Sequence, residues 1–245
     1  LLNLLFVLFI FCIVVACTCG NNKGNNGSDK NGSSTSGGGD SGKSEKSDKG
    51  DFIVQHSKVG NSKFASIDKQ IKDEKVLEKA ADKLNRALSL PNDINLKTKD
   101  CGQVNAYYDP RDKSITFCYE LMEHFFKVYK ADGYTDDEAN RSMNKAINFV
   151  FLHELGHALI DNYELPITAN EEDAADRCSS YICIEELGQE GVESILSAAD
   201  AFAIESKLGG KAPDARTMAD EHLLREQRFF NSLCMVYGSD PNKYA

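Results

Sequence analysis

The spacing of hydrophobic residues predicts a mainly helical domain. Apolar residues recur at helical intervals in the segments 66–88, 119–130, 136–161, 169–187, 190–207 and 214–237. Pro91 ends the first of these patterns and Gly133 ends the second. Thr135 and Glu138 stand where a capping box would begin the third pattern, so we expect a long helix there.

A different pattern, over residues 103–119, predicts a β-hairpin. Its two strand-like runs are separated by a turn signal at Asp109 to Asp112. Folding about that turn brings Cys101 and Cys118 within about two residues of cross-strand register, so we expect a disulfide between them. The predicted fold is therefore α+β and mainly helical, with a small hairpin or sheet.

The beginning of the chain differs from this domain. Residues 1–16 are apolar over the length of a signal-peptide core, which is short for a membrane span. No starting Met or basic segment precedes them, so we expect the first few residues to be missing. The run ends in Val14-Val15-Ala16-Cys17, which resembles the lipobox of bacterial lipoproteins, where cleavage leaves a lipid on the cysteine. The alternative is an ordinary secretory signal with an incidental cysteine.

The next segment predicts a flexible tether, because after Cys17 it is rich in Gly, Ser, Asn, Lys and Asp and offers no aliphatic or aromatic side chain to bury. We therefore expect a lipoprotein signal peptide over 1–16, a lipidated cysteine and tether over 17–50, and one domain over 51–245. This organisation implies an extracytoplasmic protein, anchored by its lipid to a bacterial membrane. The formal net charge of -10 argues against nucleic acid as a partner, because phosphate binding needs clustered Lys and Arg.

The remaining cysteines of the domain would tend to pair outside the cytoplasm. Cys178 and Cys183 are five residues apart on a predicted helix and point to different sides. At most one of them can join Cys234, and the pairing stays open.

The candidate chemistry lies in "FVFLHELGHALID", residues 149–161. His153 and His157 are four residues apart, so on a helix their imidazoles project from one face and can bind one ion. Glu154 lies beside them, placed to accept a proton from a water on that ion. Burying such polar groups without partners costs several kcal/mol, and a metal removes that cost. The pattern predicts a site for Zn2+.

A catalytic zinc site needs a third protein ligand. A third histidine six residues after the second is excluded, because that position is Tyr163. In "NEEDAADR", residues 170–177, Glu172 and Asp176 share a helix face. Glu172 can then reach the metal, while Asp176 accepts a hydrogen bond from a ligating histidine and fixes its tautomer. Glu171 is the alternative ligand.

These motifs resemble a known pattern, since H-E-x-x-H followed by E-x-x-A-D, here Glu172 to Asp176, is typical of gluzincin metallopeptidases. From about Asp100 onward the chain is similar to a bacterial family of secreted and lipid-anchored proteins that is labelled as metallopeptidase and has a domain of unknown function. The resemblance rests on both motifs and on the segments 101–102, 105–109, 115–121, 220–222, 227–231 and 237–241. Members of that family run on beyond Pro241, so we expect a C-terminal tail to be missing, which would leave Cys234 without its partner.

The resemblance implies a zincin-like domain that hydrolyses peptide bonds with zinc-activated water. His153, His157 and Glu172 would hold zinc, and Glu154 would take the proton of the water and pass it to the leaving amine. A histidine or tyrosine outside the motif would donate to the oxyanion. His222 is our candidate for this role, and its alternative is that of a surface histidine.

Other residues have weaker claims. Tyr107, Tyr108 and Tyr119 are secondary candidates for the oxyanion donor and are more simply explained by hairpin packing. We expect His124 to lie at the edge of the core, and His56 has no evident role.

The resemblance also implies how a substrate would bind. Zincins place an edge strand beside the active-site helix, where an extended peptide adds to the sheet. We expect the strand ending in Ile115-Thr116-Phe117 to fill that place and to bind a peptide or protein. The alternative interpretations are a catalytically inactive, zinc-stabilised binding domain of a surface lipoprotein, and a lipid-tethered interaction protein without metal. The particular substrate and the oligomeric state stay open.

Overall fold

The computed structural model describes residues 48–168, 170–209 and 225–245. The predictions for the apolar run 1–16, for Cys17 and the tether up to residue 47, and for His222 lie outside these residues. Within the described part of the chain, no helix is both long and apolar enough to cross a membrane.

The described elements confirm an α+β fold that is mainly helical and contains a small sheet. A short 3-10 turn, Ser62–Phe64, precedes the first helix. In chain order the strands and helices are β1 (Phe52–His56), α1 (Ala65–Asp73), α2 (Val76–Ala87), β2 (Ile94–Lys99), β3 (Ala106–Asp109), β4 (Ser114–Cys118), α3 (Tyr119–Ala131), α4 (Asp136–Asn162), α5 (Glu171–Glu185), α6 (Gly188–Gly209) and α8 (Arg225–Ser239).

The sheet has the strand order β1-β2-β4-β3. The predicted hairpin is confirmed as the antiparallel pair β3 and β4, while β1, β2 and β4 run parallel to one another. The sequence reading missed β1 and β2. In β2 the buried residues Ile94, Leu96 and Thr98 alternate with partly exposed ones, which is the period of a strand and could have indicated it.

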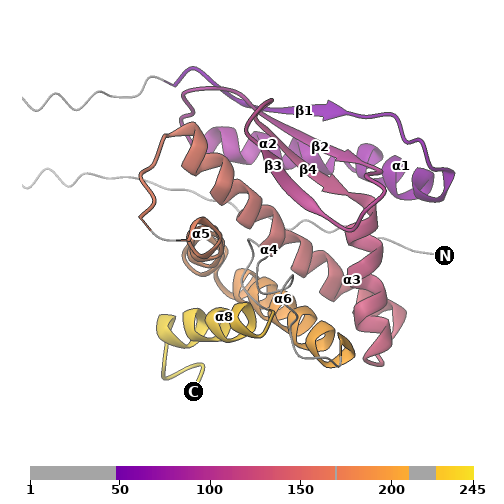
Figure 1. Ribbon diagram of the computed structural model, residues 1–245, viewed down its shortest axis with the longest axis vertical. Helices are drawn as coiled ribbons and strands as arrows, with labels where there is room; N and C mark the ends of the chain where they lie inside the picture. Colours follow the sequence, from indigo (N-terminus) through magenta and orange to yellow (C-terminus); the bar gives the residue numbers. More distant parts are fainter. Residues whose placement is uncertain (1–47, 169, 210–224) are drawn as a thin grey trace, which may run out of the picture.

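Helix α4 crosses the middle of the molecule between two layers (Figure 1). The sheet with α1 and α2 lies on one side of it, and α5, α6 and α8 lie on the other. α4 contacts β3, β4, α3, α5 and α6, and its Phe149 and Leu155 are almost completely buried. The H-E-x-x-H motif therefore sits in a helix that both layers cover.

Helix α4 begins with the predicted capping box. Thr135 Oγ1 accepts a hydrogen bond from Glu138 N, and Thr135 N donates to the Glu138 carboxylate. Two backbone donors that the first helical turn leaves unpaired are satisfied in this way, so the start of the helix is well defined.

The helical pattern predicted over 66–88 is confirmed, but two helices share it. α1 ends at Asp73 and α2 starts at Val76, with Lys75 between them in the left-handed region at φ 53°. A continuous helix would turn Glu74 and Lys75 onto the face of Ile71, which is buried, since they follow it by three and four residues. The break keeps Lys75 exposed, while Glu74 is half-buried and accepts a hydrogen bond from Gln70.

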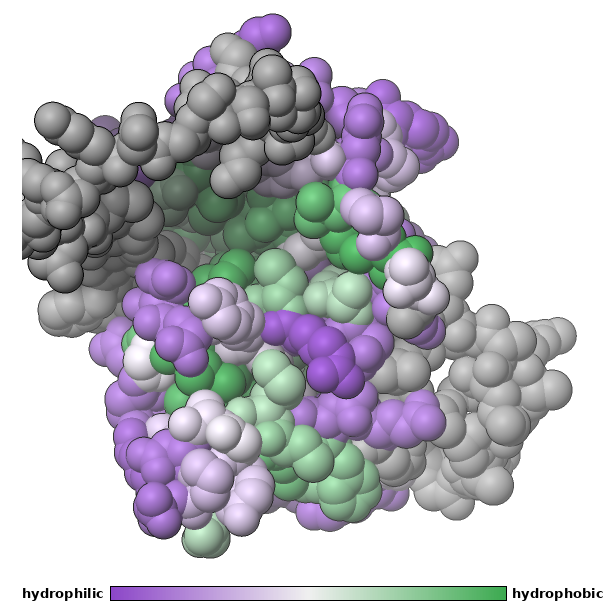
Figure 2. Space-filling view, turned by 90° about the vertical axis from the view of Figure 1, so that its left-hand side faces the viewer, coloured by the Kyte–Doolittle hydropathy of each residue, from purple (hydrophilic) through white to green (hydrophobic). Residues whose placement is uncertain are grey.

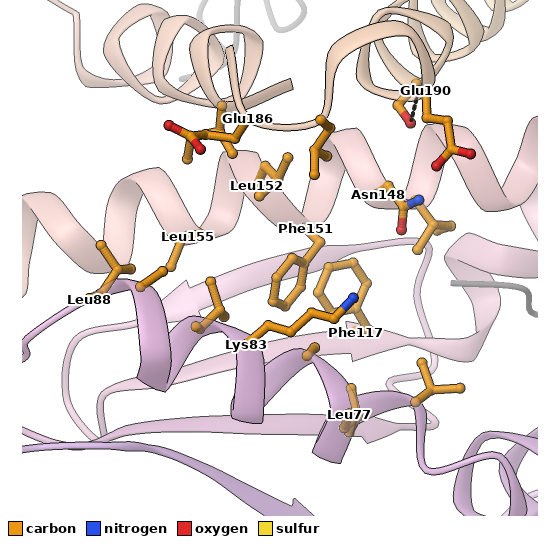
Figure 3. A pocket seen from close by; sticks show the side chains of 18 of the residues that line it. Leu77, Lys83, Leu88, Phe117, Asn148, Phe151, Leu152, Leu155, Glu186 and Glu190 are labelled. Carbon is orange, nitrogen blue, oxygen red and sulfur yellow. Dashed lines mark hydrogen bonds between the residues drawn. The ribbon is translucent and has the colours of Figure 1, made fainter. Parts of the chain in front are cut away.

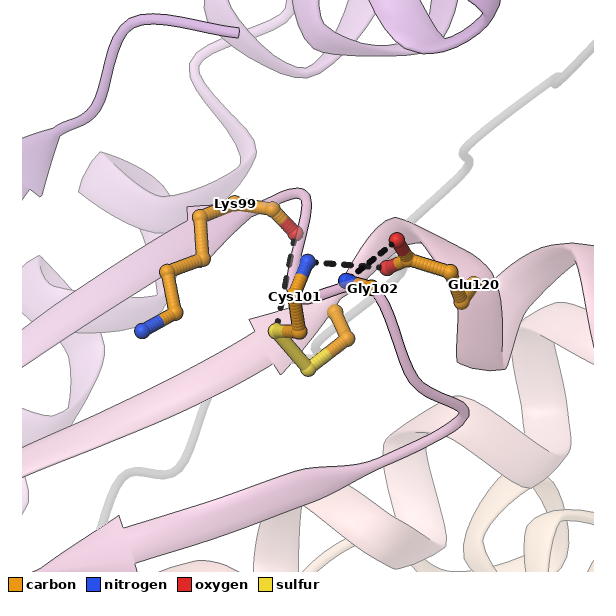
Figure 4. The surroundings of a disulfide bond; sticks show 5 residues. Lys99, Cys101, Gly102 and Glu120 are labelled. Atoms are coloured by element: carbon orange, nitrogen blue, oxygen red, sulfur yellow. Dashed lines mark hydrogen bonds between the residues drawn. A yellow bond between two sulfur atoms is a disulfide. The ribbon is translucent and has the colours of Figure 1, made fainter. Parts of the chain in front are cut away.

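The predicted disulfide joins Cys101 to Cys118, with a Cα–Cα distance of 5.4 Å (Figure 4). It ties the loop after β2 to the end of β4. The backbone N–H groups of Cys101 and Gly102 donate to the carboxylate of Glu120, in the first turn of α3. Cys178, Cys183 and Cys234 are free thiols.

Candidate metal centre

Helix α4 carries the two histidines and the glutamate into the interior. His153 is 2% exposed and Glu154 is 5% exposed, while His157 is half-buried. The Nε2 atoms of the two histidines lie 3.2 Å apart, because residues four apart on a helix stand one above the other.

Helix α5 brings a third ligand atom to them. It begins at the cap residue Asn170, whose side chain accepts a hydrogen bond from Glu172 N at 2.8 Å. Gly156 allows α5 to approach α4 closely, since a Cβ at this position would lie only 3.0 Å from Ala175 Cα. As a result, Glu172 Oε2 lies 3.2 Å from His153 Nε2, and Glu172 Oε1 lies 3.3 Å from His157 Nε2.

These three side chains can hold a single metal ion. Two ligands that an ion holds tetrahedrally, at about 2.0–2.1 Å each, are about 3.3 Å from one another. The two histidine Nε2 atoms are 3.2 Å apart, which agrees with this value, and each lies 3.2 or 3.3 Å from a different oxygen of the Glu172 carboxylate. Two imidazole nitrogens and one carboxylate oxygen are also a common ligand set for catalytic metals.

Two carboxylates hold the outer nitrogens of the histidines. His153 Nδ1 donates to Asp176 Oδ1 at 2.8 Å, and His157 Nδ1 donates to Glu171 Oε1 at 2.8 Å. A proton on each Nδ1 leaves each Nε2 with its lone pair directed at the cluster. Glu171, which the sequence left open as a ligand, therefore orients His157 from outside the cluster.

The same carboxylates change the acidity of the histidines. Burial opposes a charge on His157, but its hydrogen bonds to Glu172 and Glu171 outweigh burial and raise its pKa to about 9. Burial also opposes a charge on His153, and the hydrogen bonds to Asp176 and Glu172 likewise raise its pKa. The site thus attracts positive charge, as a cation-binding site does.

Arg228, on α8, is a member of the site that spacing arguments missed. Its Nη2 donates to Asp176 Oδ1 at 2.7 Å and its Nε donates to Asp176 Oδ2 at 2.9 Å. The only signal for it was its place in the segment 227–231, which carried part of the family resemblance. Burial opposes the negative charge of Asp176, but the contacts to His153 and Arg228 prevail and lower its pKa below the usual range.

Glu154 points toward the sheet, where Tyr108 N donates to its Oε2 at 2.9 Å. Burial raises the pKa of Glu154, and the nearby His153 and His157 partly offset this effect. Cys118 N donates to Asn105 O, so these two residues form a hydrogen-bonded pair. Hydrogen-bonded and non-hydrogen-bonded pairs alternate along an antiparallel ladder, which leaves Tyr108, three residues further on, in a non-hydrogen-bonded pair. The amide of Tyr108 therefore faces away from β4. Glu154 therefore sits at the open edge of the sheet.

The expectation about the strand beside α4 needs correction. We expected the strand ending in Phe117 to border the helix as an edge strand, but that strand is β4, which lies between β2 and β3. The edge strand next to α4 is β3. The reason is that β4 pairs on its other side with β2, a parallel partner from an earlier part of the chain.

The other candidate residues do not join the cluster. Tyr108 Oη donates to Asp161, and Tyr119 is buried, with its hydroxyl on Asp68 and Thr98. His124 pairs with Glu205 and His56 pairs with Glu78. Tyr107 stacks against Lys99.

An apolar groove of about 280 Å³ lies on the opposite face of α4, between α2, the sheet, α5 and α6 (Figure 3). Leu88, Phe117, Phe151 and Leu155 line it, and none of the residues of the metal cluster does. Figure 2 shows hydrophobic residues gathered across the middle of the face that it draws. The groove and the metal cluster are therefore separate features of α4.

An α+β domain in which H-E-x-x-H and a glutamate from the next helix surround one ion position, with a buried glutamate beside it, is the arrangement of a metal-dependent hydrolase. Residues 56–245 match a protein family described as "Putative metallopeptidase", and the chain belongs to this family. The family supports a peptidase that uses a metal ion and acts on peptides or proteins. No curated protein and no solved structure matches the chain.

Proposed function

We propose that this protein is a zinc-dependent metallopeptidase of the gluzincin type. The observation that carries the proposal is the convergence of His153, His157 and Glu172, with separations of 3.2 to 3.3 Å, beside the buried carboxyl of Glu154. Two imidazole nitrogens and one carboxylate, beside a glutamate that can act as a base, are the ligand set of catalytic zinc sites, which supports zinc as the metal.

Bound there, zinc would supply a Lewis acid that lowers the pKa of a water molecule and polarises the carbonyl of the peptide. Glu154 is the base that takes the proton from the attacking water and delivers it to the leaving amine. Its burial supports this role, because a carboxylate in an apolar setting accepts a proton more readily than one in water. His222 remains our proposal for the group that donates to the oxyanion.

The open edge of β3 is the proposed platform for the substrate. Ala106 and Tyr108 turn their backbone groups away from β4, and the Tyr108 N–H already donates to Glu154. The remaining groups on this side of β3 could pair with an extended peptide as a further strand. Because Tyr108 also contacts Glu154, a peptide on this edge would pass directly beside the base. This arrangement orients the scissile bond by main-chain contacts.

We propose an extracytoplasmic location, with a lipid on Cys17 that anchors the domain to a bacterial membrane. Two observations support it. The sequence Val14-Val15-Ala16-Cys17 is lipobox-like, and a disulfide joins Cys101 to Cys118 in the domain. Such bonds persist in oxidising compartments and are rare in the cytoplasm.

Replacing Glu154 with Gln tests the enzyme. The purified chain is analysed for bound zinc and for cleavage of a mixed peptide library, with Glu185→Gln on the exposed end of α5 as the matched control. We expect Glu154→Gln to keep its zinc and lose turnover, and the control to keep both. Full turnover in Glu154→Gln would refute the mechanism. Zinc binding without cleavage by the parent protein would favour the zinc-stabilised binding domain.

A further inference from the structure

We propose that Arg228 is a positioning residue of the metal centre, which holds Asp176 in the orientation that His153 needs to bind metal. The inference rests on the metal site proposed above. It adds a residue from the C-terminal helix α8, which is 52 residues from Asp176 in sequence, to a site otherwise built by α4 and α5.

The contacts of Arg228 determine the direction of the Asp176 carboxylate. The guanidinium binds Oδ1 and Oδ2 of Asp176, at 2.7 and 2.9 Å, and Oδ1 also accepts from His153 Nδ1 at 2.8 Å. Two parallel hydrogen bonds from a rigid planar fork prevent the carboxylate from rotating. The imidazole of His153 is therefore held in one plane, with Nε2 toward His157 and Glu172.

Arg228 is itself fixed from several sides. The side chains of Arg228 and Asp176 are only 13% and 12% exposed, and the guanidinium lies 4.6 Å from the centre of the Phe202 ring. Little water competes for the pair, so its geometry is retained. A shorter or neutral side chain would leave Asp176 as a buried anion with His153 as its partner, and the carboxylate could turn.

The position of Arg228 on α8 has a second consequence. Any contact that strengthens metal binding is strengthened by the metal to the same extent. Because α8 reaches the site through Arg228, zinc should also protect α8 against local opening. This gives a readout that does not depend on catalysis.

The test compares zinc affinity in the whole chain and in three variants, by competition with a chromophoric chelator. Arg228→Met keeps the apolar stem and removes the fork, and Arg228→Lys keeps the charge without the fork. Arg225→Met is the control, since Arg225 lies on the same helix and pairs with the distant Glu205. We expect zinc affinity about 10- to 100-fold weaker in Arg228→Met, an intermediate loss in Arg228→Lys, and no change in the control.

Hydrogen exchange completes the experiment. Zinc should slow amide exchange in α8 of the parent and of Arg225→Met, and this protection should be reduced in Arg228→Met. If Arg228→Met does not fold, Arg228→Lys and Asp176→Asn are combined in one chain. The double variant should lose no more zinc affinity than Asp176→Asn alone, because both substitutions act through one carboxylate.

The outcomes separate the two proposals. A parent chain that binds no zinc would overturn the metal site and this inference together. A parent that binds zinc, with folded Arg228→Met of equal affinity or with additive losses for Arg228→Lys and Asp176→Asn, would overturn only the role of Arg228.

Discussion

Gly156 offers a direct test of how packing builds the metal site, because it carries no side chain at the point where α4 and α5 approach. In Gly156→Ala the new Cβ would meet Ala175 Cα at 3.0 Å and the Ala175 Cβ and carbonyl oxygen at 3.3 Å. Two of these atoms belong to the backbone of α5, so they cannot rotate away. α5 must shift instead.

The size of the effect follows from these distances. Carbon atoms pack at about 3.5–4.0 Å, so α5 must move by roughly 0.5 Å or more. The helix gains about 1 kcal/mol when alanine replaces glycine, but overpacking a core costs about 1–3 kcal/mol. We therefore expect a net loss of about 1 kcal/mol in the free energy of unfolding without metal.

Zinc affinity should respond more strongly than stability. Metal sites tolerate errors of about 0.2 Å in ligand distances, and the shift of α5 would carry Glu172 beyond that limit. We expect binding at least about tenfold weaker, since α5 carries both a ligand and the carboxylates that orient the two histidines.

Zinc competition titrations and urea unfolding of the metal-free protein measure the two effects. The matched control is Gly238→Ala in α8, where nothing lies within 4 Å of the new Cβ. The control should bind zinc like the parent and unfold at equal or higher urea. If Gly156→Ala matches the parent in both measurements, the close approach of α4 and α5 does not set the position of Glu172.

Three further predictions follow from other contacts. Replacing Cys101 and Cys118 by serine opens a loop with a sequence separation of 17, and should lower the free energy of unfolding by about 3 kcal/mol in urea titrations; an unchanged midpoint would contradict this. The pKa of His157 is raised to about 9 and that of His153 is also raised, so zinc must displace protons from both histidines as the pH falls. Calorimetric titrations should show the zinc affinity falling by at least roughly tenfold per unit as the pH is lowered; a flat profile would exclude this competition. Tyr108→Pro removes the N–H bonded to Glu154 without breaking the ladder of β3, so peptide turnover should fall while zinc content stays unchanged. Tyr108→Phe is the control, and equal turnover in the two variants would show that this N–H is not needed.

The parts of the protein that could be predicted from sequence are those set by neighbouring residues. The capping box before α4 depends on residues three apart, and the pairing of His153 with His157 depends on the helical repeat. The β3–β4 hairpin and its disulfide follow from one turn. In each case the geometry of a single element or turn already decides which side chains meet.

Only the tertiary structure decided how distant segments complete the site. Whether Glu171 or Glu172 faces both Nε2 atoms depends on the rotation of α5 against α4, which the contact between Gly156 and Ala175 determines. The choice of β3 as the edge strand depends on β2, and the role of Arg228 depends on the docking of α8. These relations arise from the packing of the whole chain, and local periodicity carries no record of which segments will pack together.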